Sequence, residues 1–174
     1  MINLNQYIFE KLHINKDTDI YHYHPKDKDE FKSLVHKLIE ERGDEANLND
    51  IDTSKITDMS DLFYNSKFNG DISSWDISNV TNMNRMFWSS KFNGDISSWD
   101  VSNVTDMNYM FWGSEFNGDI YKWNVSNVIN MNYMFADSKF NNDISNWDVS
   151  NVETMRDIFS DCPLEKNPPK WYKK

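Results

Sequence analysis

Cysteine is nearly absent from this 174-residue chain. Its single cysteine, Cys162, cannot close an internal disulfide, which excludes the disulfide-stapled class of small secreted domains. Seven tryptophans and eight tyrosines supply core material instead. We therefore expect one domain that folds in a reducing compartment, since a chain of this length buries roughly two-thirds of its unfolded surface.

Basic residues are also scarce. Lys and Arg number 18 against 28 Asp and Glu, which gives a net charge of -10. Binding to a nucleic-acid backbone requires clustered cations that displace counterions, so we expect no nucleic-acid partner. A basic protein partner fits this charge better.

Long apolar runs are missing as well. No stretch approaches the roughly 18 apolar residues of a membrane span, and the mean hydropathy is -0.77. The segment from Met1 to Leu12 has no charged region followed by an apolar one, so we see no signal peptide. We expect no membrane span and a cytoplasmic or virion-associated protein.

The chain does contain an internal repeat. The four regular copies begin at Lys67, Lys91, Glu115 and Lys139, so each start follows the one before it at the same spacing. A divergent copy with the same 24-residue period precedes them over residues 43–66. A fixed period in this range indicates a solenoid, in which each unit must stack on its neighbours.

Eight positions are apolar in every regular copy. In the first regular copy they are Phe68, Ile72, Trp75, Ile77, Val80, Met83, Met86 and Phe87. Their burial contributes about 1.5–3 kcal/mol each, whereas ordering the backbone costs about 1–2 kcal/mol per residue. One copy alone should therefore be unfolded, and the copies must share buried surface.

Each copy is expected to hold one short strand and one short helix. Trp75 and Ile77 alternate with polar residues, which predicts a strand with one face inward. A column of good N-cap residues then precedes apolar residues at helical spacing, which predicts a helix of one to two turns. That column holds Asp58, Asn82, Asp106, Asn130 and Thr154. A further column, Gly70, Gly94, Gly118 and Asn142, predicts a turn with positive φ.

The repeat unit also carries a family resemblance. Residues 48–162 follow the pattern F-N-G-D-I-S-x-W-D-V-S-N-V-T-x-M-x-x-M-F. This pattern resembles the BspA-like surface-protein repeats, leucine-rich-like units of bacterial surface lipoproteins and of phage and mobile-element proteins. The resemblance implies a curved right-handed solenoid and a role in adhesion or protein binding, with no catalytic residues. Without a signal peptide or anchor in view, we expect a phage-borne or intracellular member.

These observations predict an α/β fold, a right-handed leucine-rich-repeat-like solenoid of about five 24-residue coils behind a small α/β cap. Residues 1–45 form the cap, with helices over 3–12 and from Pro25 to Gly43 and a short strand over Ile20–His24. Residues 46–162 form the solenoid. Residues 163–174 leave the repeat register after Cys162 and close the last coil with Trp171.

Two groups of residues could hold a metal. His22 and His24 would share a strand face, although no third ligand is evident, and the alternative is that they are exposed or pack in the cap. Stacked carboxylates could bind calcium, or they could accept turn N–H groups or stay solvated. They are Asp52, Asp76, Asp100 and Asp148, with Asn124 interrupting the column. For Asp71, Asp95, Asp119 and Asp143 we expect structural turn bonds, and we expect no cofactor.

Catalysis has little support in the sequence. One serine column recurs in every copy, whereas a nucleophile is needed once and beside a base. No histidine lies inside the repeats, and phosphate-binding loops and nucleophile-elbow motifs are absent. We expect a protein that is not an enzyme.

Two columns vary freely among the copies and lie three residues apart, which places them on one face of the predicted helices. Their larger members would form a partner-binding patch on the helix side, because Tyr, Trp and Arg dominate interface hot spots. The patch comprises Tyr64, Arg85, Trp88, Tyr109, Trp112 and Tyr133. The two tryptophans could instead pack between coils. A rival surface is the strand face, with Ser74, Ser98, Lys122 and Asn146 beside Tyr121.

Three functions remain open at this point. The first is a protein-binding module that uses the aromatic patch, and its partner is not named by the sequence. The second is carbohydrate binding or adhesion, because rows of Trp and Tyr stack on sugar rings. The third is a structural role, as a virion component or an assembly of solenoids end to end.

Overall fold

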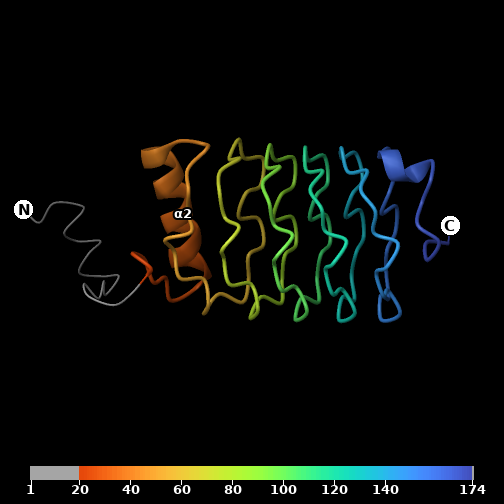
Figure 1. Ribbon diagram of the computed structural model, residues 1–174, viewed down its shortest axis with the longest axis horizontal. Helices are drawn as coiled ribbons and strands as arrows, with labels where there is room; N and C mark the ends of the chain where they lie inside the picture. The colour runs from red at the N-terminus through yellow and green to blue at the C-terminus, as the bar shows by residue number, and fades with distance from the viewer. Residues whose placement is uncertain (1–19, 174) are drawn as a thin grey trace, which may run out of the picture.

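The computed structural model describes residues 20–173. Among these residues the regular elements are α2 (Lys28–Arg42) and the short 3-10 helix η1 (Pro163–Glu165), and isolated parallel β-bridges take the place of strands. Figure 1 shows loops of chain side by side along the long axis. The prediction of an α/β solenoid of strand-plus-helix coils is therefore wrong, and the helix predicted over residues 3–12 lies outside the described part.

The predicted repeat helices are absent because their backbone turns left-handed at two positions in each copy. One such column holds Asp61, Arg85, Tyr109, Tyr133 and Asp157, at φ between 48° and 56°. The other holds Asn65, Ser89, Gly113, Asp137 and Asp161, at φ between 51° and 62°. A right-handed helix cannot continue through such residues. The N-cap column makes a different bond instead: Asp106 accepts the N–H of Asn108, two residues on, which is an Asx turn.

The predicted repeat strands are replaced by turns as well. The N–H of Trp75 donates to Ile72 O, and the N–H of Val80 donates to Ile77 O, both within one copy. These bonds between residues three apart close β-turns, so the predicted strand segment forms no run of ladder bonds with the next copy. The alternation of apolar and polar residues is present, but here it does not mark a strand.

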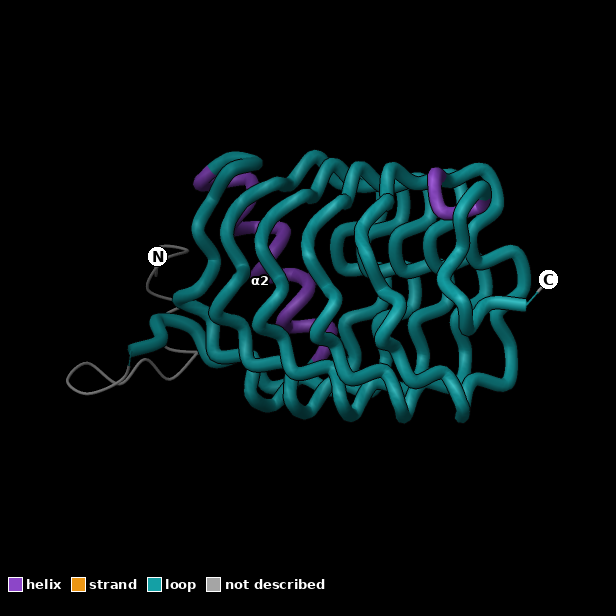
Figure 2. Tube along the Cα trace, turned by 45° about the vertical axis from the view of Figure 1, so that its right-hand side comes forward, coloured by secondary structure: helices purple, strands orange, loops and turns teal. Residues whose placement is uncertain are grey.

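Hydrogen bonds between neighbouring repeats keep them in register. In the segment after Asn82, Met83, Arg85 and Phe87 donate their N–H groups to carbonyls of the next copy. The intervening N–H groups of Met86 and Trp88 donate to the carbonyl three residues back in their own copy. Single parallel bridges link Asp58, Asn82, Asp106, Asn130 and Thr154 along the stack. Figure 2 shows the resulting loops side by side, coloured as loop rather than strand.

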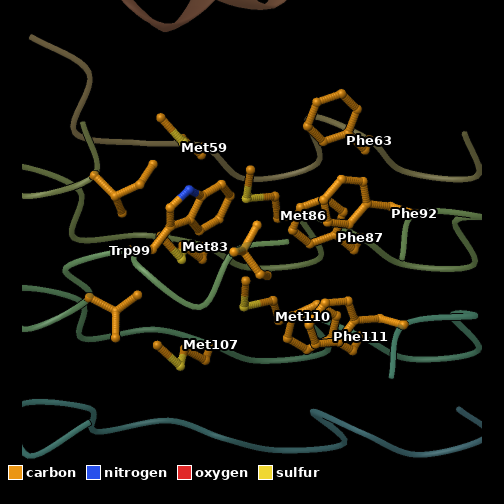
Figure 3. Packing of buried hydrophobic residues seen from close by; sticks show 14 of the residues in the cluster. Met59, Phe63, Met83, Met86, Phe87, Phe92, Trp99, Met107, Met110 and Phe111 are labelled. Carbon is orange, nitrogen blue, oxygen red and sulfur yellow. The ribbon is translucent and has the colours of Figure 1, made fainter. Parts of the chain in front are cut away.

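The core consists of one apolar column stacked on the next. Phe63, Phe87 and Phe111 lie almost parallel, with ring centroids 5.4 and 5.5 Å apart, and Figure 3 shows them beside the methionine columns. The buried indole of Trp99 donates its Nε1–H to Ile72 O in the previous copy. Ile72 O therefore accepts two N–H groups, the turn-closing one of Trp75 and the indole of Trp99, so the buried indole fills the core with its polar atom paired.

The glycine column has a steric cause rather than the predicted positive φ. Among the described glycines, only Gly43 and Gly113 have positive φ. A Cβ atom on Gly94 would lie 2.8 Å from the ring of Phe92 and 3.2 Å from Gly70 O. Only hydrogen fits in that space without movement of the ring.

The N-terminal helix was predicted correctly. Asp27 caps α2 by accepting the N–H of Glu30, and Gly43 ends it at φ 90°. Its buried face packs on the first two copies, and Phe31 lies edge-on to Trp75 of the second at 5.2 Å. The strand predicted over Ile20–His24 is reduced to one bridge between Tyr23 and Ile51.

The C-terminal segment stays in the repeat register, contrary to prediction. Leu164 and Trp171 follow Phe140 and Trp147 by one full repeat period, and they are buried and half-buried, respectively. Trp171 donates its Nε1–H to Ile144 O, the bond that Trp75, Trp99, Trp123 and Trp147 make to the copy before them. It lies over the last regular copy, as expected for a closing aromatic.

Candidate binding surface

All six residues of the predicted aromatic patch lie together in the structure. The name aromatic patch is kept for Tyr64, Arg85, Trp88, Tyr109, Trp112 and Tyr133. In each copy the segment after the N-cap column forms two consecutive turns, such as those closed by Met86 and Trp88, and we call this segment the double turn. The six residues lie on the double turns of successive copies, so the prediction that they lie on the side of a helix is wrong. Arg85, Tyr109 and Tyr133 have φ between 54° and 56°. Positive φ is rare in such bulky residues, so the stack must hold these positions against local strain.

The rings of the aromatic patch contact each other without a break. Trp88 lies edge-on to Tyr64 at 5.2 Å and edge-on to Trp112 at 5.1 Å. Trp88 also stacks on Tyr109 at 5.3 Å, and Tyr109 stacks on Tyr133 at 4.8 Å with 9° between the planes. Contacts of this geometry contribute about 0.5–1.5 kcal/mol each beyond the area they bury.

Two guanidinium groups lie over these rings. Arg85 lies 5.0 Å from the centroid of Trp88 and 5.9 Å from that of Tyr109. Arg156 lies 5.8 Å from the centroid of Tyr133 and extends the patch by one further copy. Arg156 is not among the predicted residues because it precedes the variable column by one position. Its basic side chain beside an aromatic column is the signal that could have identified it. Desolvation by its neighbours and the nearby Asp157 raise the pKa of Tyr133.

The side chains of the aromatic patch are partly exposed and packed against each other. Tyr64 is 50% exposed, and Trp88, Tyr109, Trp112 and Tyr133 are half-buried. Trp88 and Trp112 do pack against each other between copies, which was the alternative left open by the sequence. Part of each ring is still accessible to solvent. The arrangement offers a rigid, mostly apolar surface that crosses four copies of the repeat.

The rival surface is more polar. Ser74, Ser98, Lys122 and Asn146 are all exposed, as is Tyr121 at 40%. Ser98 Oγ donates to Ser73 O in the previous copy, so part of its hydrogen-bonding capacity is already used. This surface carries a single exposed aromatic side chain and lacks contiguous rings.

The carboxylate columns form turns. Asp100 accepts the N–H of Ser102, Asp148 accepts that of Ser150, and Asn124 makes the same bond to Ser126. Asp71, Asp95, Asp119 and Asp143 likewise accept the N–H two residues on, as predicted. The backbone bond from Ser73 lowers the pKa of Asp71, and that from Ser97 lowers the pKa of Asp95. Within residues 20–173 no group of three or more side chains could hold a metal ion.

The two histidines that could have bound a metal contact carboxylates instead. His22 Nδ1 lies 3.3 Å from Asp50 and His24 Nδ1 lies 3.1 Å from Asp52. Arg42 of α2 also pairs with Asp50 at 2.9 Å. Burial opposes ionisation of Asp50, but the hydrogen bond and charge of Arg42 outweigh it and lower the pKa. These pairs attach the N-terminal cap to the first repeat.

A comparison with protein families assigns the chain to one of them. The family described as "Mycoplasma protein of unknown function, DUF285" matches residues 31–137 and again residues 113–173. The chain belongs to this DUF285 family. In general terms DUF285 is a BspA-like repeat family, which agrees with the resemblance of the repeat unit. The matched range begins inside α2, so most of this helix belongs to the DUF285 module together with the repeats.

Other comparisons add nothing to this assignment. No curated protein and no solved structure matched the chain. Among residues 20–173 no helix is long and apolar enough to cross a membrane, in agreement with the sequence.

Proposed function

We propose that this DUF285 member is a non-catalytic protein-binding module and that the aromatic patch is its binding surface. The observation that carries the proposal is the unbroken contact from Tyr64 through Trp88 and Tyr109 to Tyr133. Tyr, Trp and Arg are the residue types that contribute most binding energy at protein interfaces. The patch consists entirely of these three types.

Rigidity supports the same function. Because each ring contacts the next, the rings lose little conformational freedom when a partner binds. Immobilising a free side chain costs about 0.5–1.5 kcal/mol at an interface, and this preordered surface avoids most of that cost. The ring contacts also stabilise the stack, so the same residues serve folding and binding.

A sugar ligand is less compatible with the ring geometry. Carbohydrate rings stack on exposed aromatic faces, but Tyr109 has stacked neighbours in both Trp88 and Tyr133, and Arg85 lies over Trp88. Much of the ring area that stays accessible is then edge rather than face. Ring edges and neighbouring guanidinium groups suit the mixed apolar and polar surface of a protein.

The charge around the patch favours a basic partner. Asp61 and Asp157 occupy the same column as Arg85, at either end of the patch, and Asp137 and Asp161 lie in the neighbouring column. Together with the net charge of -10, these carboxylates should steer a basic partner toward the patch and raise its association rate.

Site-specific photocrosslinking tests the location of the surface. Tyr64 and Tyr121 are tyrosines of similar exposure, 50% and 40%, on the two rival surfaces. We would replace each in turn with p-benzoylphenylalanine and irradiate the protein in host-cell lysate. The proposal expects covalent protein adducts from position 64 and none from position 121. Adducts from position 121 alone would locate the binding site on the polar surface.

The protein identified in this way then allows a quantitative test. We expect the Trp88→Ala/Trp112→Ala variant to bind it at least 10-fold more weakly than wild type, about 1.4 kcal/mol, with folding checked by circular dichroism. Ile129→Ala is the matched control, because Ile129 is 43% exposed and lies outside the patch. Equal affinity of the double variant and wild type would refute the proposed role. Binding to a glycan array without a protein adduct would favour the carbohydrate alternative.

A further inference from the structure

A groove lies among residues at the C-terminal end of the stack. Figure 1 shows this end opposite the one that α2 covers. The volume of the groove is about 610 Å³. Its walls include Glu153, Met155, Asp157 and Phe159 of the last regular copy and Tyr172 and Lys173 of the closing segment. The groove runs along the double-turn segment that pairs with the next copy everywhere else in the stack.

Backbone donors are unused in this groove. In the preceding copy, Met131, Tyr133 and Phe135 donate their N–H groups to the carbonyls of residues 154, 156 and 158. The equivalent donors one copy later are those of Met155, Asp157 and Phe159, and none has an acceptor among residues 20–173. The alternate N–H groups of Ile158 and Ser160 are bonded within their own turns. The groove therefore presents three donors on alternate residues, in the spacing with which copies pair.

Apolar side chains at this end are also incompletely covered. In the preceding copy Val125, Val128 and Met131 are 0–1% exposed. Their equivalents one copy later, Val149, Val152 and Met155, are only partly buried. Covering such side chains removes apolar surface from water, which stabilises a complex. Of these three side chains Met155 lines the groove, with Phe159 beside it, so the groove combines apolar side chains with three backbone donors that have no acceptor among residues 20–173.

We propose that this groove binds an extended segment of a partner protein, which adds to the stack as the next rung. The segment would offer carbonyls on alternate residues to Met155, Asp157 and Phe159 and at least one apolar side chain to that of Met155. This is continuous with the interface between copies, where a chain segment occupies the equivalent place at every earlier step. Addition of a strand-like segment to an open backbone edge is an established mode of peptide recognition.

A second folded copy of this chain does not supply such a segment. Its internal carbonyls at residues 82, 84 and 86 already accept N–H groups from the preceding copy. At its first copy, residues 43–66, α2 lies across the equivalent carbonyls, and His36 Nε2 contacts Leu62 O at 3.1 Å. The free carbonyls must come from a chain that is unfolded or extended in that stretch.

The groove adjoins the aromatic patch but is distinct from it. Arg156 lines the groove and lies over Tyr133 of the patch. None of the three free donors belongs to the six residues of the patch, so either surface can be tested without the other.

Amide NMR of the full chain tests the proposal. As a probe we would use a peptide with the sequence of residues 127–141, because its backbone already pairs in this register within the stack. We expect the amide signals of Met155, Asp157 and Phe159 to shift downfield and their hydrogen exchange to slow at least 10-fold. The amides of Ile158 and Ser160 should keep their exchange rates. A scrambled peptide of the same composition should have no effect.

A substitution on the groove floor gives a second readout. Met155→Lys keeps the backbone N–H but places a charge on the apolar floor, and it should weaken peptide binding at least 10-fold. Ile129→Lys is the matched control on an exposed apolar side chain outside the groove and should leave binding unchanged, with both variants checked by urea unfolding. Equal effects of native and scrambled peptides, or no change at millimolar peptide, would overturn the proposal. Sedimentation showing a dimer that protects these same amides without peptide would assign the groove to a second copy.

Discussion

Trp171 stacks on Trp147, which lies one repeat period earlier in the sequence, with ring centroids 6.4 Å apart and planes 8° apart. Both indoles donate Nε1–H to a carbonyl of the copy before, that of Ile144 for Trp171 and that of Ile120 for Trp147. The closing segment therefore repeats the tryptophan contact of the copies before it. The surrounding sequence, with two adjacent prolines, no longer follows the repeat, yet the single tryptophan keeps the register.

This relationship predicts the effect of removing the last ring. Trp171→Ala should lower the free energy of unfolding by about 1–3 kcal/mol, because the half-buried ring loses packing and one hydrogen bond. Trp147→Ala, at a fully buried position, should cost about 3–5 kcal/mol. Urea unfolding followed by circular dichroism measures both. Equal costs for the two variants would contradict the idea that Trp171 is a partial rung at the end.

The steric origin of the glycine column predicts the response of Gly94. Gly94→Ala should destabilise the protein by about 1–3 kcal/mol, since its Cβ would overlap the ring of Phe92. Gly113→Asn is the control. Gly113 has positive φ, and the equivalent positions carry Asn65, Ser89, Asp137 and Asp161, so this change should be close to neutral. Thermal unfolding compares the two, and a tolerated Gly94→Ala would refute the steric explanation.

The left-handed backbone at Tyr109 predicts a difference between two small replacements. Tyr109→Asn and Tyr109→Ala both remove the stacked ring. Asn tolerates positive φ, whereas Ala pays most of the left-handed penalty of about 1–2 kcal/mol, so the Asn variant should be about 1 kcal/mol more stable. At Glu115, where φ is not positive, Asn should have no such advantage over Ala. Chemical unfolding of the four variants decides the matter.

The turn carboxylates predict an acid dependence of stability. Hydrogen bonds from the side chain and backbone of Ser102 lower the pKa of Asp100 below its ordinary value of 3.8, and those from Ser150 do the same for Asp148. Because the folded-state pKa is the lower one, the contribution is complete above about pH 4 and is lost as the pH falls through the folded pKa.

Replacement by Asn isolates this contribution. Asn124 occupies the same column and makes the same bond, so Asp100→Asn/Asp148→Asn should leave stability near pH 7 almost unchanged. The loss of stability below pH 4 should be shallower than in wild type. Urea midpoints at pH 7, 5, 4 and 3 provide the measurement. If the midpoint of the variant falls below pH 4 as steeply as that of wild type, these two carboxylates do not contribute to the acid dependence.

Prediction from sequence succeeded where the residue type by itself favours one local backbone conformation. Gly43 ends α2 because its φ suits glycine, and Asp71 forms its Asx turn from the next two residues alone. The six residues of the aromatic patch lie together, as expected of variable positions that the core does not need, and their role in binding a partner stays a prediction. Arg156 escaped notice because the pattern that marks the patch does not include its column.

Prediction failed where neighbouring copies compete for the same backbone groups. Apolar residues at Met83, Met86 and Phe87 fit one face of a helix, but they fit two consecutive turns equally well. A helix of one or two turns has little stability of its own. The N–H of Arg85 therefore bonds to Asn108 O in the next copy rather than within a helix, and the backbone turns left-handed there.

The sequence by itself determined the 24-residue period, the apolar columns that become the core and the helix that covers the first repeat. Those features follow from residue types and their spacing, because apolar residues are buried together and capping residues fix the ends of a helix. Only the tertiary structure decided the backbone path between the columns, the steric need for glycine and the donors of Met155, Asp157 and Phe159 that have no acceptor among residues 20–173. Each of these depends on what lies one copy away, and that neighbour exists only once the copies have stacked.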